Sequence, residues 1–187
     1  MTFLGQFREV RPDSNGKEVD VFRMDNTTKS VEMPDMRADV GLGSCNCCDY
    51  FFINDNKIFV VEETRLADTI KAIEEQYSYL NDDDKKDCVV KNVRQENYVK
   101  VYGSLLVLCR LAAKCKDAAK RMKDKKHDFW LVIDGVDAEE TRGVVEYLAS
   151  YLLDDLRGVL TKKVVGDVEI IPSEILAKKL SANANTS

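Results

Sequence analysis

Residues 49–65 read Asp-Tyr-Phe-Phe-Ile-Asn-Asp-Asn-Lys-Ile-Phe-Val-Val-Glu-Glu-Thr-Arg, the most strongly patterned part of the chain. Two apolar runs rich in aromatic and β-branched residues flank the polar turn 54–57, which predicts a β-hairpin. A hairpin would bring Asp49, at the start of the first strand, beside Glu62 and Glu63 at the end of the second. Carboxylates that converge at a sheet end suit Mg²⁺, which prefers hard oxygen ligands and takes one or two from protein. Charged residues are also common at strand ends simply because those ends reach solvent.

Around this hairpin the sequence alternates between strand-like and helix-like segments. The predicted strands cover residues 17–24, 29–33, 87–93, 128–133 and 164–171. The predicted helices cover residues 65–80, 99–126, 137–156 and 173–180, with a loop at 34–44 and a polar run at 81–84 that ends the first helix. Such alternation favours a mixed sheet with helices on its faces, and strands near Val89 and Leu131 are expected to pair in parallel. We therefore predict an α/β fold, a single domain with a mixed central β-sheet flanked by helices.

The size and composition of the chain are those of an ordinary folded protein. With 187 residues, 44% hydrophobic and 33% charged, it is expected to form one domain over residues 1–180, followed by a flexible tail at 181–187. No apolar run is long enough to span a membrane and no apolar leader is seen, so we expect neither membrane insertion nor secretion. Six cysteines without such a leader predict a reducing, cytoplasmic location with mostly free thiols.

Positive charge is concentrated in one segment of an acidic chain. The formal net charge of −5 disfavours a protein that coats nucleic acid indiscriminately. Residues 110–126 nevertheless hold eight basic side chains against two acidic ones. The residues expected to contact phosphates of a nucleic acid are Lys114, Lys120, Arg121, Lys125 and Lys126. The competing interpretation is a solvated helix face.

The cysteines and the single histidine offer less specific metal-binding patterns. Cys45, Cys47 and Cys48 cluster just before Asp49, and three thiolates would suit zinc if further ligands joined them. Cysteine also packs as a small buried hydrophobe, which is the competing interpretation. His127 is expected to end the basic helix, where the helix C-terminus favours a cation, and it has no second histidine with which to bind a metal.

The two strands of the predicted hairpin, residues 48–53 and 58–64, resemble the core of the PD-(D/E)XK nuclease-like superfamily, the restriction-endonuclease-like proteins. Members place an aspartate at the head of one strand and Glu-x-Lys at the end of the next. The resemblance covers residues 17–135 and implies a restriction-endonuclease-like fold that cleaves phosphodiester bonds with Mg²⁺. It also implies that Asp49 and Glu62 are catalytic metal ligands, and that Gln76 on the following helix faces the site.

The lysine of the superfamily motif is missing from its usual position. If Glu62 is the motif glutamate, Thr64 stands where the lysine should be. If Glu63 is the motif glutamate, Arg65 stands there, and a permanently charged guanidinium cannot act as a base. Residues 62 and 64 should lie on one face of the strand and 63 and 65 on the other, and the distance from Asp49 favours Glu62.

Three functional hypotheses follow from these patterns. The first is a Mg²⁺-dependent nuclease, or a nuclease-like protein that processes nucleic acid, with Lys71 on the next helix replacing the motif lysine. Lys71 is otherwise explained as an exposed helix residue. The second is a catalytically degenerate nuclease fold that serves as a binding or assembly module. The third is an unrelated α/β adaptor whose acidic surface binds a protein partner, and self-association into a homo-oligomer is compatible with each.

Overall fold

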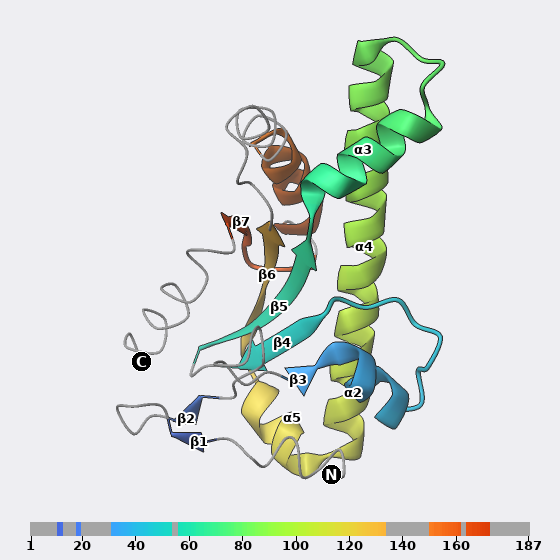
Figure 1. The fold of residues 1–187 in the computed structure, drawn as a ribbon. Coiled ribbons are helices and arrows are strands. Elements are labelled where there is room, and N and C mark those ends of the chain that lie inside the picture. Colours follow the sequence, from blue (N-terminus) through green and yellow to red (C-terminus); the bar gives the residue numbers. More distant parts are fainter. Residues whose placement is uncertain are drawn as a thin grey trace.

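The central element of the structure is a five-stranded mixed β-sheet with the strand order β3-β4-β5-β6-β7 (Figure 1). The computed structural model describes residues 11–12, 18–19, 31–53, 56–133, 150–161 and 164–172. The sheet strands are β3 (Val31–Glu32), β4 (Tyr50–Ile53), β5 (Lys57–Thr64), β6 (Lys126–Ile133) and β7 (Val168–Pro172). Two further short strands, β1 (Arg11–Pro12) and β2 (Glu18–Val19), pair with each other. The prediction of a single α/β domain with a mixed sheet is confirmed.

The predicted hairpin is formed by β4 and β5. The two strands pair antiparallel, with Tyr50 opposite Val61 and Ile53 opposite Ile58. Strand β3 pairs antiparallel with β4, whereas β6 lies parallel to both β5 and β7. Residues 128–133 of β6 are all buried, which explains why this strand is almost continuously apolar in sequence.

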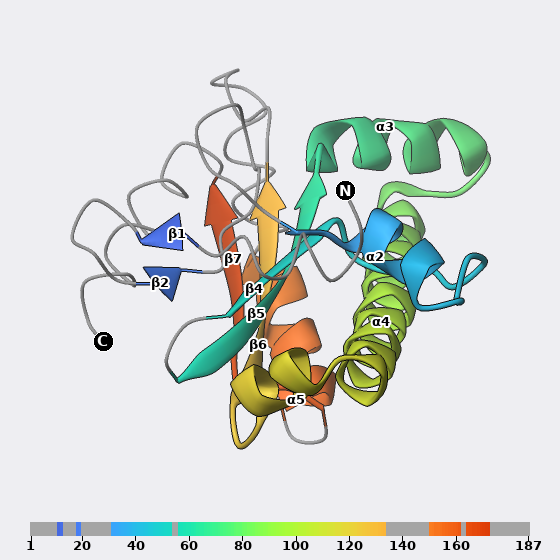
Figure 2. The ribbon, with the colours of Figure 1, turned by 90° about the horizontal axis from the view of Figure 1, so that it is seen from below.

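Helices cover the sheet and extend beyond it. They are α2 (Met33–Asp39), α3 (Leu66–Gln76), α4 (Asp82–Lys114) and α5 (Lys116–Met122), together with a helical segment at 150–156 that continues into the π-helical turn η1 (Arg157–Thr161). Helix α4 runs along one side of the sheet, and its first part projects past the sheet to pack against α3 (Figures 1 and 2). An ion pair of 3.1 Å between Arg94 and Asp155 joins α4 to the segment 150–156.

Residues 87–93 belong to α4, so the strand predicted there was wrong. Val89, Val90 and Val93 form part of the buried face of the helix and pack with α3. The run 81–84 begins α4 rather than ending α3, because the Asn81 side chain accepts a hydrogen bond from the N–H of Asp84 at 2.9 Å as an N-cap. The parallel partners of β6 are consequently β5 and β7. A short run of β-branched residues does not by itself distinguish a strand from a buried helix face.

Two other element boundaries differ from the predictions. Helix α2 takes up Met33, expected at the end of a strand, and residues 34–39, expected in a loop, with Pro34 in the first turn where no hydrogen bond from its nitrogen is needed. The helix predicted at 99–126 is interrupted at Cys115, whose backbone is extended, and β6 already begins at Lys126. His127 therefore lies in a strand and not at a helix end.

Several predicted elements lie outside the described residues. They are most of the strand 17–24, the first part of the helix 137–156, the helix 173–180 and the tail 181–187. The domain limit at residue 180 stays a prediction for the same reason. Within the part of the chain that the structure describes, no helix combines the length and apolar character needed to cross a membrane.

Candidate functional site

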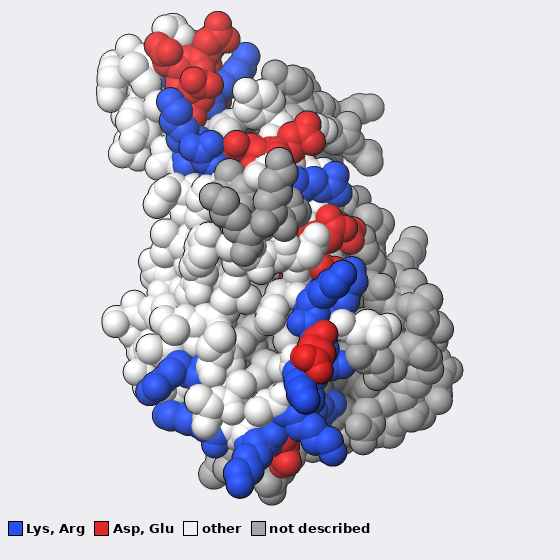
Figure 3. Space-filling view, turned by 180° about the vertical axis from the view of Figure 1, so that it is seen from behind, with Lys and Arg blue, Asp and Glu red and all other residues white. Residues whose placement is uncertain are grey.

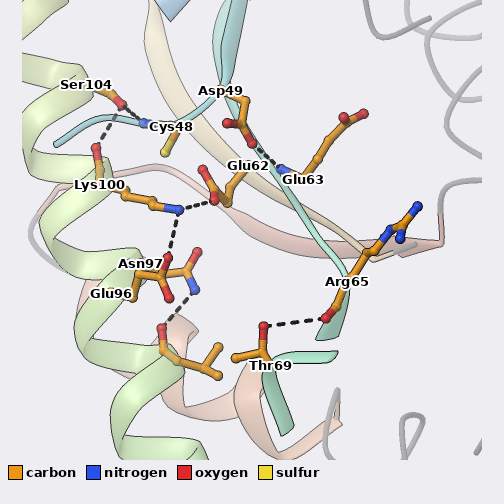
Figure 4. Close-up of polar contacts among 11 residues, drawn as sticks. Cys48, Asp49, Glu62, Glu63, Arg65, Thr69, Glu96, Asn97, Lys100 and Ser104 are labelled. Carbon is orange, nitrogen blue, oxygen red and sulfur yellow. Dashed lines mark hydrogen bonds and ion pairs between the residues drawn. The ribbon is translucent and has the colours of Figure 1, made fainter. Parts of the chain in front are cut away.

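The hairpin places Asp49 and Glu62 side by side (Figure 4). Asp49 immediately precedes β4, and because Tyr50 pairs with Val61, the next position along the ladder brings Asp49 to Glu62. The Oδ2 atom of Asp49 accepts a hydrogen bond from the backbone N–H of Glu63 at 2.9 Å. The two carboxylates that the sequence predicted to converge are therefore neighbours at one end of the hairpin.

A lysine from α4 completes this cluster. The Nζ atom of Lys100 donates hydrogen bonds to Oε1 of Glu62 and, at 2.8 Å, to Oε1 of Glu96 (Figure 4). Lys71, the replacement lysine suggested from the sequence, is instead exposed on α3. Lys100 follows Glu62 by 38 residues, and no local pattern connects the two positions. The sequence therefore held no signal from which this contact was predictable.

The position of Lys100 depends on close packing between α4 and the segment that enters β4. The backbone N–H of Cys48 donates to Oγ of Ser104 at 2.8 Å, and that hydroxyl donates to the carbonyl of Lys100 at 2.8 Å. One residue away, a Cβ atom on Gly103 would lie 1.7 Å from the carbonyl oxygen of Asn46. Only a glycine allows this approach of the two backbones, which holds the ammonium of Lys100 beside the carboxylates.

Glu62 is the buried carboxyl group of the site. Only 4% of its surface is exposed, and among the described residues its Oε2 atom has no hydrogen-bond partner. Burial, and then the negative charge of Asp49, raise the pKa of Glu62 to about 8, although the Lys100 ammonium acts in the opposite direction. Burial would lower the pKa of Lys100, but hydrogen bonds to Glu62 and Glu96 outweigh it and raise that pKa. At neutral pH Lys100 is therefore charged, and Glu62 is mostly protonated.

The carboxylate pair fits a divalent cation such as Mg²⁺. Asp49 and Glu62 present hard oxygen donors, and the unpartnered Oε2 of Glu62 is a buried acceptor that a cation would satisfy. In the described ranges, no group of three or more His, Cys, Asp or Glu side chains is arranged to hold a metal ion. The site thus offers two protein ligands, which is typical of Mg²⁺ sites that complete their coordination with water and phosphate oxygens.

An open groove of about 650 Å³ gives access to Lys100. It runs between α3 and α4, and Lys100 and Glu96 form part of its wall. Neutral hydrogen-bonding side chains line much of the remainder, namely Asn46, Thr69, Asn92 and Gln95. A ligand in the groove would meet these hydrogen-bonding side chains, the apolar side chains of Ala72, Ile73 and Val99, and the ammonium of Lys100.

The remaining motif candidates lie around the edge of the cluster. Glu63 and Thr64 are half-buried at the end of β5, whereas Arg65 is exposed and its guanidinium points away from Glu62 (Figure 4). Gln76 is exposed at the last turn of α3, about 15 Å from Leu66 by the rise of the helix. The structure therefore does not bring Gln76 to the carboxylates.

The predicted phosphate-binding residues are spread over three elements. Lys114 ends α4, Lys120 and Arg121 lie in α5, Lys125 follows α5, and Lys126 begins β6. Lys and Arg side chains gather at this end of the molecule, in the lower part of Figure 3. Lys114 is about 21 Å from Lys100 along α4 at 1.5 Å per residue, so this basic region is separate from the carboxylates.

The cysteine cluster shows the properties of packing residues. Cys47 and Cys48 are buried and Cys45 is half-buried. Burial raises the pKa of the Cys47 and Cys48 thiols, which disfavours the thiolates that a zinc ion requires. Burial also lowers the pKa of His127 in β6. Neither the cysteines nor His127 belong to a metal-binding group in the residues described.

The site thus combines two carboxylates from one hairpin with an ammonium from a helix far along the chain. Glu62 connects them, since it lies beside Asp49 and accepts a hydrogen bond from Lys100. No family model, curated protein sequence or solved structure matches the chain, so its function is inferred from this geometry.

Proposed function

We propose that the protein is a metal-dependent nuclease-like enzyme that hydrolyses phosphodiester bonds at the Asp49–Glu62 site. The observation that carries this proposal is the buried Glu62 carboxylate, held between Asp49 and Lys100 with one oxygen left without a donor among the described residues. Buried charges with a strongly shifted pKa are concentrated at functional sites. If the pair of Lys100 and Glu62 only stabilised the fold, it would not require the carboxylate of Asp49 beside Glu62.

The arrangement of the hairpin supports a restriction-endonuclease-like fold. An aspartate stands at the head of β4 and a glutamate near the end of β5, in a mixed sheet flanked by helices. The departure from the superfamily motif is Thr64, in the position of the lysine. We propose that Lys100 replaces that lysine from α4, because its ammonium contacts the motif glutamate directly.

Each residue then has a distinct role. Asp49 and Glu62 would hold Mg²⁺, which supplies positive charge to a phosphate and lowers the pKa of a bound water. Lys100 is protonated at neutral pH, so it would attract a phosphate oxygen rather than remove a proton. Glu96 accepts a hydrogen bond from Lys100 and so keeps the ammonium directed at the site.

The test is cleavage of plasmid DNA, single-stranded DNA and RNA by the purified protein with Mg²⁺ or Mn²⁺. We expect Asp49→Asn and Glu62→Gln to abolish cleavage, because each removes a metal-binding charge while preserving side-chain shape. Lys100→Met should reduce the rate by about 100-fold or more, the usual scale for removing a group that stabilises transition-state charge. Lys71→Ala is the matched control, since it removes an exposed lysine of α3. Cleavage that survives Asp49→Asn and Glu62→Gln together would refute the assignment.

A metal-independent binding module is the second candidate, and one observation favours it. The ammonium of Lys100 already contacts Glu62, so the lysine itself occupies part of the space in which a cation would bind. Calorimetric titration with Mg²⁺ and Mn²⁺ distinguishes the two functions. Absence of both metal binding and cleavage, with nucleic-acid binding retained, would support the module.

A further inference from the structure

Asn97 on α4 holds a buried oxygen atom that no group among the described residues satisfies. Only 4% of the surface of this residue is exposed. Its Nδ2 atom donates a hydrogen bond to the carbonyl of Val93 at 2.8 Å, whereas its Oδ1 atom has no hydrogen-bond partner in the part of the chain that the structure describes. Because a carbonyl can only accept, the nitrogen of the amide must face Val93, and the oxygen must face away from it.

Helix geometry places this amide beside the contact between Lys100 and Glu62. Asn97 precedes Lys100 by three residues, so the two side chains are neighbours on one side of α4. Lys100 donates to Glu62 from that side, and Figure 4 shows the Asn97 amide with its oxygen toward this contact. Two buried acceptors without a donor, Oδ1 of Asn97 and Oε2 of Glu62, therefore belong to one cluster.

We propose that Oδ1 of Asn97 accepts a hydrogen bond from a water molecule that is bound to the cation at Asp49 and Glu62. This inference rests on the proposed function, because it requires a cation at that site. Mg²⁺ keeps several of its waters when it binds to a protein, and these waters direct their hydrogen atoms away from the ion, toward acceptors. Asn97 would supply one such acceptor and would fix the orientation of the water.

A neutral acceptor suits this position in the folded protein. Asp49, Glu62 and Glu96 already bring three acidic groups to the ammonium of Lys100. A further carboxylate would add repulsion in a buried place, whereas an amide oxygen accepts a hydrogen bond without a charge.

Packing alone does not explain an asparagine at this position. Val93 and Val101, one turn to either side of Asn97 on the buried face of α4, are apolar, so a leucine would match these surroundings. The carbonyl of Val93 lies within the helix and already accepts the backbone N–H of residue 97, so it does not need the amide. A buried acceptor without a donor costs free energy, which indicates that a bound group satisfies it.

Asn92 on the same helix makes the same local hydrogen bond without a buried oxygen. Its Nδ2 atom donates to the carbonyl of Cys88, four residues earlier, at 2.8 Å. Asn92 is exposed, so solvent reaches its amide. It is therefore the matched control for Asn97.

Isothermal titration calorimetry with Mn²⁺ at one fixed pH, combined with thermal unfolding of the metal-free protein, tests the proposal. Asn97→Leu should weaken Mn²⁺ binding by about 10- to 100-fold, the usual effect of removing a group that supports a metal ligand. The same variant should raise the melting temperature of the metal-free protein by about 2–4 °C, because an apolar group replaces an unsatisfied acceptor. Asn92→Leu should bind Mn²⁺ as the parent does.

Asn97→Asp should show the opposite pattern. It keeps an oxygen acceptor and should bind Mn²⁺ at least as tightly as the parent, but it buries a further acid and should unfold at a lower temperature. General damage to the fold would lower the melting temperature and the affinity together, so the opposed changes identify the role of the amide.

Unchanged Mn²⁺ affinity in Asn97→Leu, or a lower melting temperature of that variant without metal, would overturn the role of Asn97 and leave the proposed metal site intact. A parent protein that binds no Mn²⁺ would overturn the proposed function and this role together.

Discussion

Glu62 must lose a proton before it binds a cation, and burial beside Asp49 opposes that loss below a pH of about 8. We therefore expect the affinity for Mn²⁺ to rise about tenfold per pH unit from pH 6 to the pKa, and then to level off, because protons compete with the metal. Isothermal titration calorimetry at half-unit intervals from pH 6 to 9 measures this dependence, together with the proton released on binding.

Glu62→Gln is the control for that titration, because an amide has no proton to release. Its residual affinity should be low and nearly independent of pH. A parent protein whose affinity is equally flat would show that Glu62 does not bind the metal, or that its pKa lies outside this range.

The protonation of Glu62 also affects the free energy of unfolding. The pKa of Glu62 rises from 4.5 to about 8 on folding, so the folded state binds more protons than the unfolded state between these values. Stability from this group is complete below the unfolded pKa and is lost as pH rises through the folded pKa. Relative to Glu62→Gln, the parent should lose on the order of 4 kcal/mol between pH 4.5 and pH 8. Urea unfolding of both proteins at several pH values measures the difference, and parallel curves would contradict the raised pKa of Glu62.

At the scale of elements, the close contact between α4 and the segment that enters β4 leaves no room for a side chain at Gly103. Gly103→Ala would force a Cβ atom to within 1.7 Å of the Asn46 carbonyl oxygen, so the helix would have to move. We expect a loss of about 3 kcal/mol in the free energy of unfolding. Lys100 would also be displaced from Glu62, so metal binding should weaken in the fraction that remains folded.

Gly158→Ala is the matched substitution, because nothing lies within 4 Å of the Cβ atom it would introduce. Chemical denaturation of both variants should show Gly158→Ala close to the parent and Gly103→Ala far below it. Equal stabilities would mean that the approach of α4 to Asn46 is less close than the structure indicates.

Local signals explain which elements were predictable. The hairpin of β4 and β5 combines a polar turn with two β-rich runs, and both features lie within residues 49–65. The start of α4 was misassigned because Val89 and Val90 resemble a short strand, and because an acidic run can cap a helix as well as follow one. Its assignment depends on the side chains of α3 that cover Val89, Val90 and Val93, and that packing is tertiary.

At the scale of the whole molecule, the basic residues lie together although they come from three elements. If they bind phosphates, Lys120→Ala with Arg121→Ala should reduce the salt dependence of nucleic-acid binding by about one unit of slope per lost contact. Fluorescence anisotropy from 50 to 300 mM salt measures that slope. Lys85→Ala with Lys86→Ala, at the opposite end of α4, is the matched control, and equal slopes for the two pairs would contradict the assignment.

How much of the site could be predicted depends on whether a residue is placed by local sequence or by tertiary packing. Asp49 and Glu62 were found because one hairpin holds both, and its pairing follows from local sequence. Lys100 was missed because its position depends on the docking of α4, through Gly103 and Ser104, against a segment more than fifty residues earlier. No periodicity within α4 distinguishes Lys100 from the other lysines of the chain.

The separation of Glu62 and Lys100 by 38 residues also orders events during synthesis. The hairpin leaves the ribosome first, and at that stage the Glu62 carboxylate is surrounded by water and ionises as it does in a short peptide. Only after α4 has emerged and docked does Glu62 become buried against an ammonium, with a raised pKa. The growing chain therefore passes through a stage that has both acids but no contact with Lys100, and that contact forms only when the helix arrives.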